Sequence, residues 1–273
     1  MKTHSVTNDA AVGIRAAFTL IELSLVSMII LILAALFLAG LTRARMAAQR
    51  LACMNNLRQW GCAAHFYAHD NGDALPREAA VDGINTWEMT GAATNRDVWY
   101  NALAEITGIA TMVWYSQSPS SQQDFYSSGK IFHCPSVRFP AVAATYPNFS
   151  LAINSKLMRD FEERTDPGPP GNLWGRKISE ISIPDRTALF LDNGIPREQR
   201  FSEFQPAYTG EPKAFASQFP ARHNRGGNIV FVTGRVLTMP AREVVETDPA
   251  SVYRGRARYP SEVIWRHDPA LVP

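Results

Sequence analysis

Residues 18–41 read FTLIELSLVSMIILILAALFLAGL, an apolar run that contains a single ionisable side chain, that of Glu22. No residue from Leu23 to Leu41 carries a charge, and a helix of that length rises roughly 28 Å, close to the hydrocarbon thickness of a bilayer. A secretory signal has a shorter apolar core of about 7–15 residues followed by a cleavage site, whereas this run continues into Thr42-Arg43-Ala44-Arg45. The stretch therefore predicts a single membrane-spanning helix.

Glu22 is the unusual residue of this run, because a carboxylate in an apolar segment is costly and indicates a functional role with a cationic partner. The sequence Ala17-Phe18-Thr19-Leu20-Ile21-Glu22 resembles the cleavage and methylation motif of type IV prepilins and type II secretion pseudopilins, with Ala17 where that family usually has Gly. The resemblance implies that a prepilin peptidase cuts between Ala17 and Phe18, that the new N-terminus of Phe18 is methylated, and that Glu22 is needed for assembly.

The freed amine of Phe18 in a neighbouring copy would then be the cation that Glu22 requires. A buried pair of this kind contributes to register more reliably than to stability, because desolvation offsets most of the Coulomb attraction.

The sequence predicts four parts along the chain. Residues 1–17 form a short leader, 18–41 the transmembrane and assembly helix, 42–69 an amphipathic continuation of that helix, and 70–273 an extracytoplasmic globular domain. The basic residues Arg43, Arg45 and Arg50 after the apolar run outnumber Lys2 and Arg15 before it, which taken alone places the domain in the cytoplasm. The resemblance implies the opposite orientation, and we adopt it because the motif is the more specific signal.

Composition bounds the function further. Of 273 residues, 46% are hydrophobic and 19% are charged, and the formal net charge is only +2. A chain with so little excess positive charge lacks a large basic surface for nucleic acid, so we expect no nucleic-acid partner. We interpret the basic cluster Arg222-His223-Asn224-Arg225 as a solvated loop.

The helix is predicted to continue from Thr42 to about His69. No Pro occurs in this range, and small or apolar residues recur at steps of three and four: Ala44, Ala47, Leu51, Met54, Leu57, Gly61 and Ala64. Asp70-Asn71-Gly72-Asp73, followed by Pro76, then ends the helix with turn residues. The run Met54-Asn55-Asn56-Leu57-Arg58-Gln59 with Tyr67 and Asn71-Gly72 further resembles a subgroup of pseudopilin-G-like proteins.

Residues 77–180 are irregular in pattern. The Ser/Gln-rich stretch 116–128 and the Pro/Gly-rich stretch 166–171 are predicted to be exposed loops. Aromatic residues between them are expected to cover the helix and the sheet rather than to form a sugar-binding platform: Trp87, Trp99, Tyr100, Trp114 and Tyr115.

Strands are predicted late in the chain, at 187–191, 228–232 and 235–239. The last two form a hairpin whose two-residue turn is Thr233-Gly234, although Thr disfavours positive φ. The resembling subgroup often carries a His, nine residues and then Asp-Gly near the C-terminus. Here His223 is followed by nine residues and then Thr233-Gly234, so only the turn is carried over.

Cysteine geometry restricts the disulfides. Cys53 and Cys62 are nine residues apart, which places them on opposite faces of a helix and about 13 Å apart along it, so they cannot bond to each other. A disulfide would join Cys134 to either of them. The resembling subgroup, in which Cys-x-x-Asn-Leu and Cys-Pro-Ser occur together, implies the pair Cys53–Cys134, and such a bond would fit an extracytoplasmic domain.

Catalytic and metal motifs are weak. His65 and His69 have the i, i+4 spacing of a zinc protease but lack the Glu after the first His, so a packed or solvated pair is favoured over a zinc site. No Gly-x-Ser-x-Gly elbow or phosphate loop occurs. We therefore expect no enzymatic activity, no metal and no cofactor.

Together these features predict an α+β, pilin-like fold: a long N-terminal helix, membrane-spanning in its first half, packed on a small antiparallel β-sheet with long loops. The resemblance implies a structural subunit of a type II secretion pseudopilus or a type IV pilus-like filament. Its partners would be other copies or related pilin-like subunits, the prepilin peptidase, the inner-membrane assembly platform and the membrane. It would reside in the bacterial inner membrane as a single-pass protein with a periplasmic C-terminal domain, and in an extracytoplasmic filament after assembly. The alternative is a membrane-anchored extracytoplasmic enzyme or ligand-binding domain that uses the segment only as a tether.

Overall fold

The computed structural model describes residues 19–79, 85–127, 130–139, 146–158, 175–268 and 270. The predicted leader, its cleavage site Ala17–Phe18 and the predicted loop at 166–171 lie outside the described residues. The chain divides into two compact units, residues 1–45 and 46–273, and each is described by itself.

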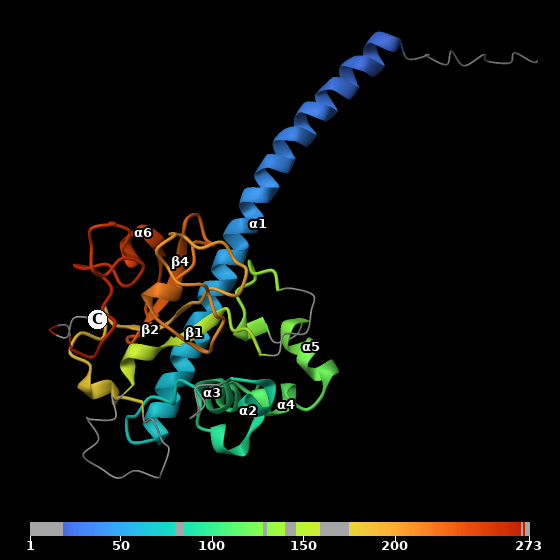
Figure 1. Ribbon diagram of the computed structural model, residues 1–273. Helices are drawn as coiled ribbons and strands as arrows, with labels where there is room; N and C mark the ends of the chain where they lie inside the picture. The colour runs from blue at the N-terminus through green and yellow to red at the C-terminus, as the bar shows by residue number, and fades with distance from the viewer. Residues whose placement is uncertain are drawn as a thin grey trace, which may run out of the picture. The chain divides into compact units, whose positions relative to one another are not determined.

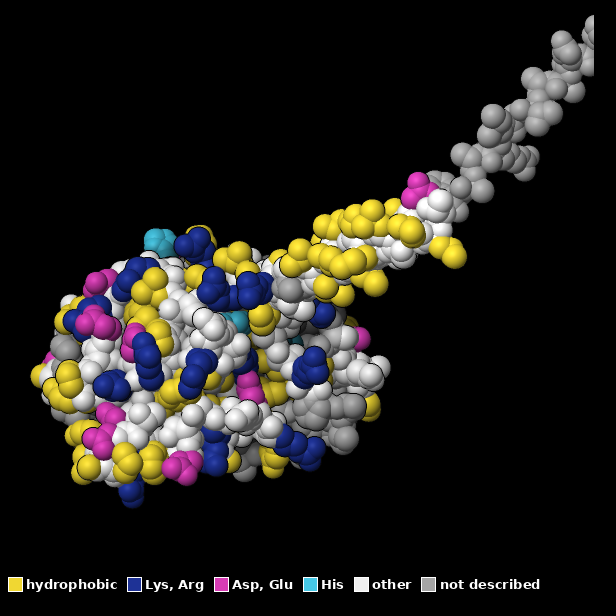
Figure 2. Space-filling model, turned by 90° about the horizontal axis from the view of Figure 1, so that it is seen from above, with side chains coloured by type: hydrophobic (Ala, Val, Ile, Leu, Met, Phe, Trp, Pro, Cys, Tyr) yellow, Lys and Arg dark blue, Asp and Glu magenta, His cyan; other side chains and the backbone are white. Residues whose placement is uncertain are grey.

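Helix α1 (Leu20–Asp70) begins in the first unit, and a reciprocal pair of hydrogen bonds caps its start. The Glu22 N–H donates to Thr19 Oγ1 at 3.2 Å, and the Thr19 N–H donates to Glu22 Oε2 at 2.9 Å, which satisfies two backbone donors that a helix start otherwise leaves unpaired. The large apolar side chains that follow are exposed, for example Leu31 and Phe37 at 70% each. Figure 2 shows hydrophobic side chains along this part of the helix.

By length and composition, α1 could cross a membrane: its most apolar window has a mean hydropathy of 2.7. Burying these exposed apolar side chains in lipid removes the cost of hydrating them, which is the physical reason for such a segment to be a span. The predicted apolar first half of the helix is thus compatible with a single membrane span.

The second half of α1 belongs to the globular unit and buries one face. Its fully buried residues recur at steps of three and four, as on one face of a helix: Cys53, Leu57, Trp60 and Ala64. The predicted stripe is right for Leu57, Gly61 and Ala64 and wrong for Ala44, Ala47 and Leu51, which are exposed, while the buried Cys53 and Trp60 were not predicted on it. The helix ends at Asp70, and the next turn places Gly72 and Asp73 at φ 64° and 73°. Gly adopts this left-handed conformation without strain and Asp tolerates it, so the predicted end of the helix is confirmed.

A five-stranded sheet forms the centre of the globular unit, in the order β3-β1-β2-β4-β5. Figure 1 labels its strands β1, β2 and β4. The strands are β1 (Leu151–Asn154), β2 (Ala188–Asp192), β3 (Lys213–Ala214), β4 (Gly226–Phe231) and β5 (Val236–Pro240). Pairs β1–β2, β2–β4 and β4–β5 are antiparallel, but β3 runs parallel to β1. The sheet is therefore mixed, and the prediction of an antiparallel sheet holds for three of its four pairings.

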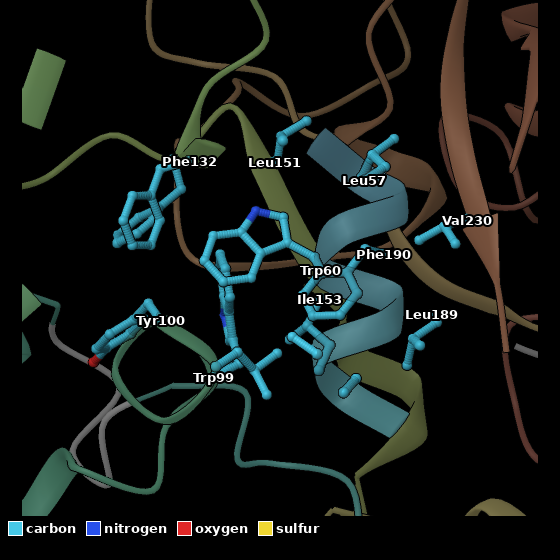
Figure 3. Close-up of a cluster of buried hydrophobic side chains, with 14 of the residues drawn as sticks. Leu57, Trp60, Trp99, Tyr100, Phe132, Leu151, Ile153, Leu189, Phe190 and Val230 are labelled. Atoms are coloured by element: carbon cyan, nitrogen blue, oxygen red, sulfur yellow. The ribbon is translucent and has the colours of Figure 1, made fainter. Parts of the chain in front are cut away.

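The two faces of the sheet bury separate clusters, because successive side chains of a strand point to opposite faces. One face of the sheet packs against α1 and against the short helices that lie between α1 and the sheet in the sequence. The cluster on this face includes Leu151, Phe190 and Val230. Figure 3 shows Trp60 pointing from α1 into this cluster near Trp99, at a ring-centroid distance of 5.2 Å.

The opposite face carries Ala152, Leu191 and Ile229 and is covered by helix α6 (Ala241–Val244) and by the segment that contains Trp265. The sheet is therefore covered on both sides, with α1 on the first.

The segment between α1 and the sheet contains more helix than the sequence predicted. It comprises α2 (Trp87–Gly91), η1 (Ala93–Asn95), α3 (Trp99–Thr107), α4 (Met112–Tyr115), α5 (Pro119–Ser127) and η2 (Lys130–Phe132). Short 3₁₀ turns η3 (Ser155–Leu157), η5 (Ile178–Glu180) and η6 (Ala216–Gln218) lie further along the chain.

The Ser/Gln-rich stretch 116–128 is helical over α5 and is not the predicted loop. Ser118 Oγ accepts a hydrogen bond from the Ser121 N–H at 3.2 Å, which caps the helix, and Phe125 anchors it in the core at 0% exposure. The expectation that the aromatic residues cover the core is confirmed for Trp87, Trp99, Tyr100 and Tyr115, whereas Trp114 is 43% exposed.

The β4–β5 hairpin is confirmed, but its connection is longer than the predicted two residues. Strand β4 ends at Phe231 and β5 starts at Val236, with Thr233 and Gly234 between them. A two-residue type I′ turn needs positive φ at both central positions, and here only Gly234 adopts it, at φ 82°. The β-branched Thr233 thus accounts for the longer connection.

Candidate functional site

Glu22 is the one predicted N-terminal site residue that the structure describes, because Ala17 and Phe18 lie outside the described residues. Its side chain is exposed, and its Oε2 accepts hydrogen bonds from the N–H and the hydroxyl of Thr19, each at 2.9 Å. Both bonds use the same oxygen. Glu22 Oε1 therefore remains the oxygen with which a further cation could be bound.

A second group of functional side chains meets inside the globular unit, and we call it the buried cluster: Cys53, Cys134, Asp192 and His223. Their donor atoms all lie within 4.8 Å of one another, and the exposed fractions of the four residues are 0%, 1%, 0% and 5%. They come from the buried face of α1, the loop after η2, the last residue of β2 and the turn before β4. Groups far apart in sequence thus share one dry location.

The contacts within the buried cluster are short. Cys53 Sγ donates to Asp192 Oδ1 at 2.9 Å, and Cys134 Sγ lies 3.2 Å from His223 Nε2. The same Nε2 atom lies 3.4 Å from Asp192 Oδ2. One ring nitrogen therefore faces both a sulfur and a carboxylate oxygen, although it can hold only one proton.

Backbone geometry presents His223 to this site. The His223 N–H donates to the Gly226 carbonyl at 2.8 Å, and the Gly226 N–H donates back at 3.2 Å. The two residues between them, Asn224 and Arg225, have φ of 52° and 65°, as a tight turn with positive φ at both central positions requires. The strained conformation of Arg225 fixes the direction in which His223 enters the core.

Neighbouring groups hold the other residues of the buried cluster in place. The Asn228 N–H donates to Asp192 Oδ2 at 2.7 Å, and the Cys134 N–H donates to Ser150 Oγ at 2.7 Å. Arg222, whose side chain is 4% exposed, binds Glu198 with two hydrogen bonds of 2.6 Å.

Arg222 also donates to the backbone carbonyls of Ser150 and Asn193 at 3.2 and 2.5 Å. One side chain thus connects the segments of β1, β2 and β4 that surround the buried cluster.

Burial sets the electrostatics of the site. It raises the pKa of Asp192 to about 6, and the charge of Cys134 acts in the same direction. Burial likewise raises the pKa of Cys53, whereas the hydrogen bond from Cys53 lowers the pKa of Cys134. Burial acts to lower the pKa of His223, but its hydrogen bond to Cys134 and the charge of Asp192 outweigh that effect and raise it. The two thiols are thus shifted in opposite directions, and Cys134 gives up its proton more readily than Cys53.

Thiolate, imidazole and carboxylate together form a donor set that binds zinc and related metals. The arrangement is unsuited to nucleophilic catalysis of the Cys-His-Asp kind. There the carboxylate orients the ring through the nitrogen opposite the nucleophile, whereas here Cys134 and Asp192 contact the same nitrogen of His223.

The sequence named Cys53 and Cys134 and missed Asp192 and His223 as their neighbours. In the structure both cysteines are free and buried, while Cys62 is free and exposed, which confirms that Cys53 and Cys62 lie on opposite faces of α1. The Cys53–Cys134 disulfide itself stays a prediction.

Two further sequence expectations have a clear outcome. His65 Nε2 lies 2.5 Å from the Val232 carbonyl oxygen, and His69 is exposed. The two side chains therefore do not point at one metal position. The interpretation of residues 222–225 as a solvated loop is wrong for Arg222 and His223, because both are buried against Glu198 and the buried cluster.

A surface pocket of about 350 Å³ is lined by residues 136–139 and 195–198. Its ionisable lining residues are Arg138, Arg197 and Glu198, and Glu198 is already bound by Arg222. The pocket thus offers two cations and no obvious acid–base pair.

Comparison of the chain with protein-family models, with curated proteins and with solved structures gave no match.

Proposed function

We propose that this chain is a pilin-like structural subunit of a type II secretion pseudopilus or a type IV pilus-like filament, held in the bacterial inner membrane before assembly. One observation carries the proposal. The first part of α1 is apolar and exposed, has a single carboxylate near its start, and continues as the same helix into an α+β domain. A plain anchor would gain from Glu22 only the helix cap that it forms with Thr19, whereas its charge adds to the cost of insertion.

The proposed chemistry is a pairing between copies. After cleavage before Phe18, the new amine of one subunit would reach Glu22 of its neighbour, and Glu22 Oε1 would accept it while Thr19 holds Oε2. The exposed side chains between Leu20 and Leu41 would be covered by lipid before assembly and by other subunits after it. Prepilin peptidase and the assembly platform are the further partners that this function requires.

The first test is the N-terminus of the mature protein. We expect mass spectrometry of the full chain, purified from its native membrane, to find N-methylated Phe18 as the first residue. A chain that keeps Met1 would contradict the processing step.

The second test is the role of the carboxylate. Glu22→Ala and Glu22→Gln subunits are expected to insert into the membrane but to enter filaments at least tenfold less than the native chain, measured by cross-linking between copies and by immunoblotting of sheared filaments. Ser24→Ala is the matched control, since its hydroxyl only donates to the Ile21 carbonyl of its own helix. Native levels of assembly for Glu22→Ala would favour the alternative, a membrane-tethered enzyme or ligand-binding domain.

A further inference from the structure

We propose that the buried cluster is a metal site that binds one thiophilic divalent ion, zinc by its donor set, and that the ion fastens helix α1 to the sheet. The cluster provides two sulfurs, one imidazole nitrogen and one carboxylate oxygen, all within 4.8 Å of one another. Four protein ligands fill a tetrahedral zinc shell, so the site is of the closed, structural kind.

The distances fit a metal with small shifts. Zinc bonds of about 2.3 Å to sulfur and about 2.0–2.1 Å to nitrogen and oxygen imply tetrahedral ligand separations of roughly 3.3–3.8 Å. Three contacts measure 2.9, 3.2 and 3.4 Å, the first and the last to different oxygens of Asp192, and no ligand separation exceeds 4.8 Å. The ligands would need to shift by about 1 Å or less, some apart and some together, which is within the reach of side-chain rotation.

Hydrogen bonds do not account for every close contact of the cluster. His223 Nε2 faces both Cys134 Sγ and Asp192 Oδ2 with a single proton position. The one thiol proton of Cys53 is directed at Asp192 Oδ1. An ion at the centre of the cluster would bond to all four side chains at once and would neutralise charges that are expensive to bury.

The surroundings hold the ligands in position as a metal site requires. The Asn228 N–H orients the Asp192 carboxylate, Ser150 receives the Cys134 N–H, and Arg222 ties the carbonyls of Ser150 and Asn193 together. Hydrogen bonds of this kind orient ligands and strengthen metal binding.

A disulfide between Cys53 and Cys134 is the competing state of these two sulfurs. Its formation would remove both thiol protons and two electrons, and it would leave Asp192 Oδ1 without the donor that it has in the reduced structure. A buried carboxylate and a buried imidazole would then remain with no role in the bond. The metal uses all four groups, which is why we favour it.

The test begins with metal content. We expect the full chain, purified in detergent without chelators or reductants, to contain about one zinc ion per chain by inductively coupled plasma mass spectrometry. His223→Gln and Asp192→Asn are expected to lower this content at least tenfold. Cys62→Ser, which changes the exposed thiol of the same helix, should keep it.

Two measurements on the unmutated chain guard against variants that fail to fold. Replacement of the ion by cobalt should give the near-ultraviolet charge-transfer band of thiolate ligands. After chelation and unfolding, all three cysteines of the chain should react with a thiol reagent.

A chain without metal would overturn the proposal, whether its buried thiols prove to be free or joined in a disulfide. Metal that remains in both His223→Gln and Asp192→Asn would overturn it as well. The zinc content of the Glu22→Ala chain should equal that of the native chain, so failure of this proposal and failure of the filament function can be told apart.

Discussion

Among single residues, Glu78 is a buried acid that forms an ion pair with Lys213. Its side chain is 10% exposed, and its Oε1 accepts from Lys213 Nζ at 3.3 Å. Burial raises the pKa of Glu78 above its ordinary value, although the charge and hydrogen bond of Lys213 and the charge of Lys156 act to lower it. Glu211 adds a small effect that raises it. Lys213 is therefore the cation that makes ionisation of Glu78 tolerable in the fold.

Lys213→Met should destabilise the protein in a pH-dependent manner. A group whose folded pKa lies above its unfolded value contributes stability at low pH and loses it as the pH rises through the folded pKa. Without Lys213 the folded pKa of Glu78 rises further, so the loss should be small near pH 4 and should grow to about 1 kcal/mol at about pH 8. Urea unfolding of the full chain in detergent at both pH values measures it.

Lys177→Met is the control for that experiment, because Lys177 is exposed and carries the same charge. An equal loss for Lys213→Met at both pH values would exclude the ionisation of Glu78 as the cause.

Residues that act together in the buried cluster differ in how far sequence could find them. Cys53 and Cys134 could be singled out, because the chain has three cysteines, helix geometry excludes the pair Cys53–Cys62, and the resemblance implies the pair Cys53–Cys134. Asp192 and His223 could not be added, since their approach depends on strand pairing and on a turn with two residues at positive φ. The one usable signal was the charged residue Asp192 directly after an apolar strand, an expensive place for an unpartnered carboxylate.

At the scale of elements, the close approach of α1 to the sheet depends on Gly61. A Cβ atom at this position would lie 3.0 Å from Val230 Cγ2, tighter than ordinary van der Waals contact. Glycine costs a helix about 1 kcal/mol relative to alanine, so its presence inside α1 has a packing reason. The sequence showed Gly61 on the apolar stripe, but the partner Val230 depends on the tertiary fold.

We expect Gly61→Leu to destabilise the globular unit by about 1–3 kcal/mol, because the added side chain must push α1 away from β4. Thermal unfolding followed by near-ultraviolet circular dichroism, which reports Trp60 and Trp99 next to this contact, is the measurement. Cys62→Leu is the matched control: it adds the same side chain one residue later, on the exposed face. A similar loss in both variants would show that packing against Val230 is not the cause, since leucine is a better helix former than glycine.

Helix α5 shows where element prediction failed and why. Composition alone made residues 116–128 a loop, but serine is a good helix cap, glutamine is a good helix former and a single buried Phe125 suffices to hold a short helix on the core. By contrast, α1 and the turn after it could be predicted, because a long period of apolar residues and a Gly at positive φ are local signals.

At the scale of the whole molecule, α1 belongs to both units of the chain. The large apolar side chains between Leu20 and Leu41, such as Leu31 and Phe37, are exposed, whereas Cys53, Leu57 and Trp60 are completely buried in the globular unit. The first part of the helix is thus apolar enough to cross a membrane, and its second half is part of the core of a folded domain. Loss of its second half removes core residues and not merely a tether.

This division predicts how truncated chains will behave. A fragment of residues 46–273 retains the buried face of α1 and should be soluble, monomeric and cooperatively folded, with the near-ultraviolet circular dichroism of the full chain in detergent. A fragment of residues 72–273 lacks Leu57 and Trp60, and the sheet face that they cover would be exposed to water. Burial of two such side chains is worth about 1.5–3 kcal/mol each, and an open core costs more, so this fragment should aggregate or lose fixed tertiary structure. If the shorter fragment folded as well as the longer one, the assignment of α1 to the core would be wrong.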